Sequence, residues 1–217
     1  MKGLIIKDLC IIKNQMKSLL LVLGVFVILS IINKDASFIL FLVPFYMVMI
    51  LITTFSYDEF NNWERYCNSL PLSRNQIVKA KYLLFNACTI ILLFIGFIAS
   101  IFIPIFIDNI SFESLISTLL GVAFGVTFVI SLLIPFYYRF GSQKGRIMVF
   151  ISIAVLALLI ALISKANIFN NASFLTFINN LNNLSLGVMA IILLLLMFIL
   201  IFISYQISLR IYNKKEF

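Results

Sequence analysis

The chain has 217 residues, of which 63% are hydrophobic and only 11% are charged, and its mean hydropathy is +1.16. Soluble domains carry about 25% charged residues, so the composition excludes a soluble enzyme and predicts an all-α integral membrane protein. The formal net charge of +8 does not indicate a nucleic-acid-binding surface, because the basic residues flank apolar runs and form no continuous patch.

The chain begins with an amphipathic stretch, residues 1–18, which we expect to lie along the membrane interface as a helix. On a helical wheel its apolar side chains share one face, and Asp8 and Gln15 interrupt that face. A basic start before an apolar run is also typical of signal peptides, but no A-x-A cleavage site follows. We interpret the stretch as a retained elbow, which either only anchors the first span or also contacts a cytoplasmic partner.

Six apolar segments follow, each interpreted as a helix that crosses the bilayer, for which roughly 20 residues are needed. They cover residues 19–32, 38–55, 82–107, 115–138, 147–163 and 186–205, within one transmembrane domain over 19–217. All but two of the 16 Lys and Arg residues then lie on one side, and the exceptions are Lys34 and Lys165. Since short cytoplasmic loops retain positive charge, we predict a multi-pass plasma-membrane protein with both termini in the cytoplasm.

With these boundaries no charged residue falls inside a span, and the chain contains no histidine. Ionisable groups at membrane depth are costly and usually functional, so their absence argues against a channel or secondary carrier. The absence of histidine also argues against a His-based zinc enzyme and against a His-dependent protease, because both need an imidazole side chain. The glycines at Gly141 and Gly145 do not form an ATP-binding motif. We therefore expect no catalytic residue, metal or cofactor on this chain.

The connection between the second and third spans, residues 56–81, carries the most informative pattern. Residues 57–69 place apolar and aromatic side chains at helical spacings, and Trp63, Arg65 and Tyr66 are residue types enriched in protein interfaces. Pro71 ends this predicted helix, and Ser73 to Gln76 form a capping box before the third span. The segment either docks on a partner or lies in the headgroup layer as an aromatic belt.

Several features of the spans and of the long outer loop bear on packing and substrate. Pro44, Pro104 and Pro135 fall inside spans two, three and four, where each removes a backbone donor and can kink its helix. Gly121 and Gly125 predict a close helix contact, within one chain or between two. Few polar residues occur in the spans, which favours an apolar or amphipathic substrate. Residues 164–185 are either an amphipathic lid over the exit or an interfacial loop.

Short motifs in the first 82 residues, together with the six-helix plan, resemble one family of membrane proteins. The motifs are Met1-Lys2-Gly3-Leu4, Lys7-Asp8, Tyr57-Asp58-Glu59, Trp63, Tyr66, Ser69-Leu70-Pro71-Leu72-Ser73-Arg74, Ile77-Val78 and Lys81-Tyr82. They are similar to those of small ABC-2 type exporter permeases. The resemblance is closest to the membrane subunits of bacterial exporters of phenol-soluble modulins and related antimicrobial peptides.

The resemblance implies a permease subunit that moves an amphipathic or hydrophobic substrate, such as a peptide, out of the cell. It would pair with a second permease, identical or homologous, and with two copies of a cytoplasmic ATPase that binds ATP and Mg²⁺. Residues 57–69 would form the coupling helix. The implied contacts with the ATPase are Lys7, Asp8, Tyr57, Asp58, Glu59, Trp63, Glu64, Arg65 and Tyr66.

Two other functions remain open on the sequence. An ABC-type sensor or immunity complex would use the same kind of membrane subunit. A small channel or secondary carrier is the other alternative, and the absence of intramembrane charges is the main observation against it.

Overall fold

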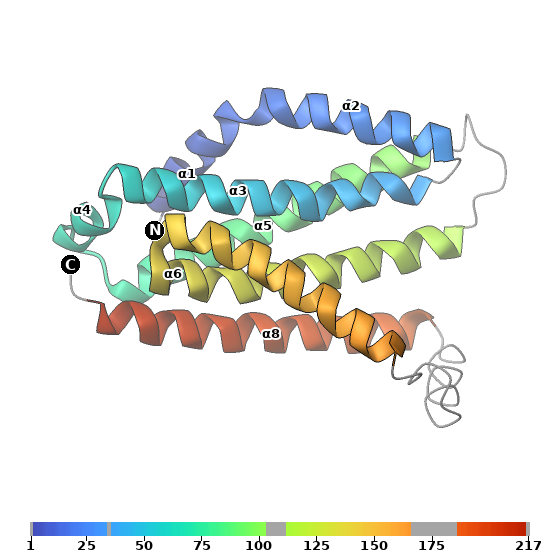
Figure 1. Ribbon diagram of the computed structural model, residues 1–217. Helices are drawn as coiled ribbons and strands as arrows, with labels where there is room; N and C mark the ends of the chain where they lie inside the picture. Colours follow the sequence, from blue (N-terminus) through green and yellow to red (C-terminus); the bar gives the residue numbers. More distant parts are fainter. Residues whose placement is uncertain (1, 34–35, 103–111, 166–185, 216–217) are drawn as a thin grey trace.

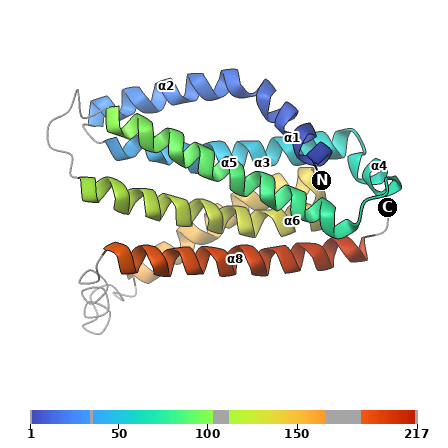
Figure 2. The same cartoon turned by 180° about the vertical axis from the view of Figure 1, so that it is seen from behind.

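The structure is a computed structural model that describes residues 2–33, 36–102, 112–165 and 186–215. These residues form long helices that run side by side, as Figure 1 and the reverse view in Figure 2 show. The short helix α4 and both ends of the chain lie at one end of the bundle. We call this end of the bundle the α4 end.

Two helices occupy the N-terminal region, α1 over Lys2–Asn14 and α2 over Met16–Asn33. The chain turns between them at Gln15, whose side-chain amide donates a hydrogen bond to Thr53 Oγ1 at 2.6 Å. The Tyr46 hydroxyl donates to the Gln15 carbonyl at 2.9 Å. The polar residue that interrupts the apolar face of the sequence pattern therefore fastens the α1–α2 turn to α3.

A 3₁₀ helix, η1 over Ala36–Phe41, leads into α3 over Leu42–Phe60, and α4 follows over Trp63–Ser69. The structure thus corrects the prediction of one helix over residues 57–69, because α3 continues to Phe60 and the chain then breaks. Asn62 adopts the left-handed conformation at φ 49°, which asparagine tolerates better than most residues. The outcome is a sharp corner in place of a continuous helix.

The next helix, α5, covers Arg74–Phe102 and begins with the predicted capping box. The Gln76 backbone N–H donates to Ser73 Oγ, and the Ser73 N–H donates to Gln76 Oε1, each at 3.3 Å. The prediction of a turn at Leu70 to Leu72 is also confirmed. The capping box lets α5 begin at a defined residue, and this sets the position of Lys81 two turns later.

Helix α6 covers Phe112–Lys165 and consists of two arms that meet at Gly141, where φ is 78°. Figure 1 shows the first arm running toward the α4 end and the second arm returning from it. Pro135 lies inside the first arm, but the break comes at Gly141. A Cβ atom at Gly121 or Gly125 would meet nothing within 4 Å, so the described part of this chain does not make the close contact predicted there.

The last helix, α8, covers Leu186–Lys214 and lies at the periphery of the bundle. Only 11% of the apolar stretch of α8 is buried inside the protein, compared with 56% for the apolar stretch within Phe38–Phe60. The core therefore lies around α3, where Phe55 stacks on Tyr137 at 4.9 Å between ring centroids and on Phe85 at 6.2 Å. Pro44 lies in the first turn of α3, where its missing N–H breaks no helical bond.

Among the described residues, four helices are long and apolar enough to cross a membrane: Phe38–Phe60, Arg74–Ser100, Glu113–Ser142 and Gly187–Lys214. A shorter apolar helix covers Leu20–Asn33, and the second arm of α6 contains the fifth predicted span, 147–163. Helical structure is thus present at all six predicted segments within the described ranges. Pro104 and most of the predicted loop 164–185 lie outside those ranges.

Candidate functional site

Two lysines and two aspartates from three helices form an ion-pair cluster at the α4 end. Lys81 Nζ of α5 lies 2.9 Å from an Asp8 carboxylate oxygen of α1 and 2.7 Å from one of Asp58 of α3. Lys7 Nζ pairs with Asp58 and lies 3.0 Å from Asp8. Each aspartate thus contacts both lysines, and the four formal charges cancel. We call these residues the four-charge cluster.

The four-charge cluster is largely shielded from solvent. Asp8, Asp58 and Lys81 are 3%, 7% and 6% exposed, and Lys7 is the most accessible member. A charge removed from water is tolerated only while its partners remain in place, because desolvation is expensive and the partners offset it. The cluster therefore specifies one position of α1 against α3 and α5.

Aromatic rings extend the cluster to α4 and to the core. Lys7 Nζ lies 4.2 Å from the centroid of the Trp63 ring, the first residue of α4. Lys81 Nζ lies 5.2 Å from the Phe55 ring, which belongs to the aromatic core of α3. Such cation–π contacts are stronger when they are desolvated. The start of α4 is therefore connected to the same charges that hold α1.

Glu59 connects the end of α3 to the reversal of α6. Its carboxylate accepts a hydrogen bond from the Ser142 backbone N–H at 2.5 Å. The preceding residue, Gly141, has a positive φ that favours glycine, and a Cβ there would lie 3.3 Å from Glu59 Oε2. At Gly145 a Cβ would lie 2.5 Å from the Tyr137 ring, so glycine allows this close approach. The connection between the predicted spans 115–138 and 147–163 is thus a tight corner at Gly141.

Helix α8 is attached to α4 at the same end of the bundle. Lys215 forms an ion pair with Glu64, and both side chains are about one third exposed. The Asn68 side-chain amide donates to the Tyr212 hydroxyl at 3.1 Å. Exposed pairs of this kind contribute less than about 1 kcal/mol each, so the α8 attachment is weaker than the four-charge cluster.

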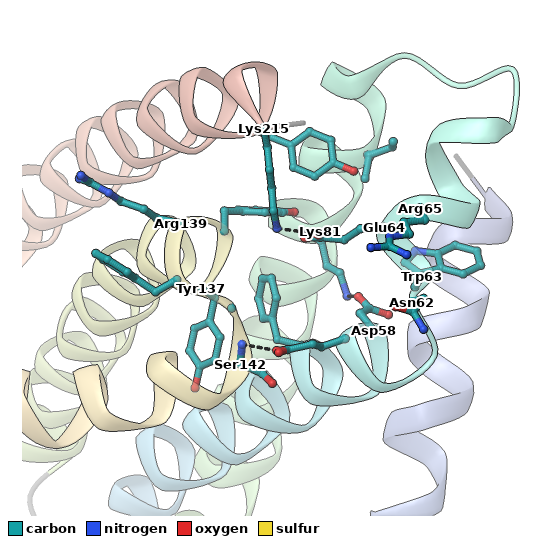
Figure 3. Close-up of a pocket in the computed structure, with 17 residues that line it drawn as sticks. Asp58, Asn62, Trp63, Glu64, Arg65, Lys81, Tyr137, Arg139, Ser142 and Lys215 are labelled. Atoms are coloured by element: carbon teal, nitrogen blue, oxygen red, sulfur yellow. Dashed lines mark hydrogen bonds and ion pairs between the residues drawn. The ribbon is translucent and has the colours of Figure 1, made fainter. Parts of the chain in front are cut away.

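These contacts surround a cavity of about 370 Å³. Figure 3 shows side chains from α3, α4, α5, α6 and α8 gathered around it, with Asp58 and Lys81 on one side and Ser142 below. The wall combines aromatic rings with charged groups, of which Asp58, Lys81, Glu64 and Lys215 take part in ion pairs. The cavity lies where five helices join, so a shift of α4 changes its shape.

The predicted contact residues divide into three groups in the structure. Tyr57, Arg65 and Tyr66 are exposed, and the Tyr57 and Tyr66 side chains are 49% and 58% accessible. Phe60, at the corner before α4, is 85% exposed. Asp8 and Asp58 are buried and, together with Lys7, belong to the four-charge cluster. The remaining three, Glu59, Trp63 and Glu64, fasten the ends of α3 and α4 to neighbouring helices.

Sequence reasoning missed several residues of the site, namely Lys81, Ser142, Tyr212 and Lys215. Lys81 was placed just outside the third span, yet α5 begins at Arg74 and carries it into the protein interior. One signal was present, because Asp8 interrupts an apolar helical face and therefore requires a buried partner. Nothing in the local pattern identifies which of the lysines that partner is.

The cysteines near this end differ in accessibility. Cys67 of α4 is fully buried, and burial raises the pKa of its thiol, whereas Cys10 is exposed. Among the described residues, no three His, Cys, Asp or Glu side chains are grouped as metal ligands. The contacts described at this end are ion pairs, hydrogen bonds and ring contacts between helices.

Comparison with known proteins gives a family match. The family model described as "ABC-2 family transporter protein" matches residues 3–213. No curated protein and no solved structure matches the chain.

Proposed function

Because this chain belongs to the ABC-2 family of transporter proteins, as a membrane permease subunit, we propose that it serves an ABC exporter and is driven by a separate ATPase that binds its α4 end. The observation that carries the proposal is the family match over residues 3–213. The geometry of the α4 end supports it, since exposed aromatic and basic side chains project there from a rigidly attached base.

The proposed topology has six spans with both termini in the cytoplasm. The charge asymmetry supports it, because all but Lys34 and Lys165 of the 16 basic residues lie on the side of the termini. The presence of helices at all six segments supports it as well. In this arrangement α1 is the interfacial elbow and the α4 end is cytoplasmic.

The proposed coupling surface consists of Tyr57, Phe60, Arg65 and Tyr66, the exposed side chains at the corner and on α4. Aromatic and arginine side chains are the types that dominate interface energies. The base of the corner is held by the four-charge cluster, so a displacement of α4 carries α1, α3 and α5 with it. Lys7, Asp8 and Asp58 are therefore proposed to transmit force between helices. The residues proposed to contact the ATPase are the exposed ones of the coupling surface.

The proposed substrate is amphipathic or hydrophobic and is exported as a peptide by a bacterial cell. The resemblance of residues 1–82 to peptide-exporter permeases and the scarcity of polar residues in the spans support this substrate. The proposed assembly contains two ATPase copies and a second permease. Gly121 and Gly125 support that pairing, because their small surface meets no neighbour within the described chain.

The test is co-purification of the chain with its cognate ATPase from membranes, followed by measurement of ATP turnover. The double variant Arg65→Ala/Tyr66→Ala is expected to lower ATPase recovery roughly tenfold or more, since two hot-spot residue types are lost. The matched control Phe94→Ala/Phe198→Ala removes exposed aromatics from the lipid-facing parts of α5 and α8. Equal ATPase recovery with the double variant and the wild type contradicts the coupling surface.

A further inference from the structure

A basic groove lies between the end of the first arm of α6 and the last turns of α8. Its volume is about 450 Å³. Of the six described residues that line it, four are basic, and the six are Tyr138, Arg139, Arg210, Ile211, Lys214 and Lys215. The groove is separate from the proposed coupling surface, because it contains none of the residues Tyr57, Phe60, Arg65 and Tyr66.

Most of the positive charge in this groove has no acidic partner among the described residues. Lys215 pairs with Glu64, whereas no ion pair among the described residues involves Arg139, Arg210 or Lys214. All three of these side chains are exposed. Figure 3 shows the Arg139 side chain pointing away from the central cavity and from the charges that line it. The groove therefore presents about three uncompensated positive charges.

An exposed apolar stripe continues from the groove along α8. Ile203, Ile207 and Ile211 follow one another at intervals of four residues and so share one face of the helix. Ile203 and Ile207 are 50% and 45% exposed. Arg210 and Lys214 have the same spacing at the end of the helix. This side of α8 therefore changes from apolar to basic toward the α4 end.

We propose that this groove binds the headgroup of an anionic phospholipid, with an acyl chain lying along the isoleucine stripe of α8. A phospholipid has the same order of parts, an anionic phosphate next to an apolar chain, and α8 is the helix least covered by protein among the candidate spans. Topology rules place basic residues on one side of the membrane, but they do not require residues from α6 and α8 to converge on one groove. The proposal does not depend on the proposed function.

The groove is also joined to α4. Lys215 lines it and pairs with Glu64 of α4, and the Tyr138 ring contacts Tyr212 edge to face at 5.4 Å. A bound headgroup neutralises the repulsion among Arg139, Arg210 and Lys214, and so it stabilises the attachment of α8 to α4.

The experiment uses the full-length chain, purified in a neutral detergent and titrated with phosphatidylglycerol or with phosphatidylcholine of the same acyl chains. Bound lipid is counted by native mass spectrometry. The triple variant Arg139→Gln/Arg210→Gln/Lys214→Gln is expected to bind phosphatidylglycerol roughly tenfold or more weakly, because each basic residue near an anionic lipid contributes severalfold to binding. The control Lys13→Gln/Lys17→Gln/Lys79→Gln removes the same formal charge from exposed positions elsewhere and is expected to bind like the wild type.

Four results would overturn the proposal. They are equal binding of the two lipids, an equal loss in both triple variants, complete displacement of the lipid by soluble glycerol phosphate at the same concentration, and a dimer that excludes lipid. An equal loss in both triple variants shows a diffuse charge effect, and displacement by glycerol phosphate shows a site for a free anion. A dimer that excludes lipid shows an interface between copies of the chain. Because Arg139, Arg210 and Lys214 are exposed, the triple variant is expected to fold. If it does not fold, the single variant Arg210→Gln decides the question, and it is expected to bind phosphatidylglycerol severalfold more weakly than the wild type.

Discussion

At the scale of single residues, the buried charges at the α4 end have the largest energetic consequences. Asp8, Asp58 and Lys81 each contact two charges of opposite sign and are almost fully covered. Their pairing need not make the protein more stable than an apolar core of the same shape. It does make any single unpaired member costly, and this specificity fixes the position of α1.

Replacement of Lys81 by glutamine is expected to lower the free energy of unfolding by about 3 kcal/mol, because two buried aspartates then share one lysine. Unfolding in detergent is followed by the fluorescence of Trp63, the single tryptophan of the chain. The control Lys79→Gln alters an exposed lysine on the same helix and is expected to change stability by less than about 0.5 kcal/mol. The double variant Asp58→Asn/Lys81→Gln leaves Lys7 and Asp8 as a balanced pair and should recover part of the loss. A loss for Lys81→Gln no larger than for the control would contradict the role of the cluster.

At the scale of elements, the corner between α3 and α4 is the feature that local reasoning described least well. The apolar spacing of residues 57–69 is compatible with one helix, yet α3 keeps its packed face as far as Asp58 and the chain turns a corner at Asn62. The buried face of α4 is then set by tertiary contacts of Trp63 and Cys67, while Tyr66 remains exposed.

The thiol of Cys67 reports whether α4 stays packed on the bundle. In a Cys88→Ala background, a maleimide is expected to label exposed Cys10 at least about tenfold faster than Cys67 at pH 7. The reason is that burial covers the Cys67 thiol and raises its pKa, so that the reactive thiolate is scarce. The variant Trp63→Ala removes the ring that packs beside Lys7 and should increase Cys67 labelling severalfold, with Cys10 as the internal control. Rapid labelling of Cys67 in the unaltered α4 would show that α4 is not docked as described.

At the scale of the whole molecule, charge asymmetry and helix packing agree on one arrangement. The termini, α4 and the reversal at Gly141 lie together at one end of the bundle, and this end carries nearly all of the basic residues. The proposed six-span topology, with that end in the cytoplasm, is the one that the positive-inside rule favours.

Reporter fusions test that topology directly. Green fluorescent protein fused after residue 217 is expected to fluoresce, and alkaline phosphatase fused after residue 34 or residue 110 is expected to be active, because only exported phosphatase folds. Phosphatase fused after residue 70 is expected to be inactive and serves as the matched internal position. An active phosphatase at residue 70 would place the proposed coupling segment outside the cell and contradict the proposed function.

The sequence by itself determined the class of the protein, its helical segments and the capped start of α5. These features depend on local composition and on spacing along one helix, where apolar surface and backbone donors set the free energy. Gly121 and Gly125 illustrate the limit of such patterns, because a small surface on one helix does not say whether another helix covers it.

Only the tertiary structure decided which charges are buried together and where the chain turns at the α4 end. Lys7, Asp8, Asp58 and Lys81 are spread over 75 residues of sequence, and a helical wheel cannot show that their three helices meet. The physical reason is that the energy of a buried charge depends on partners a few ångströms away in space. Those distances exist only after α1, α3 and α5 have packed against one another.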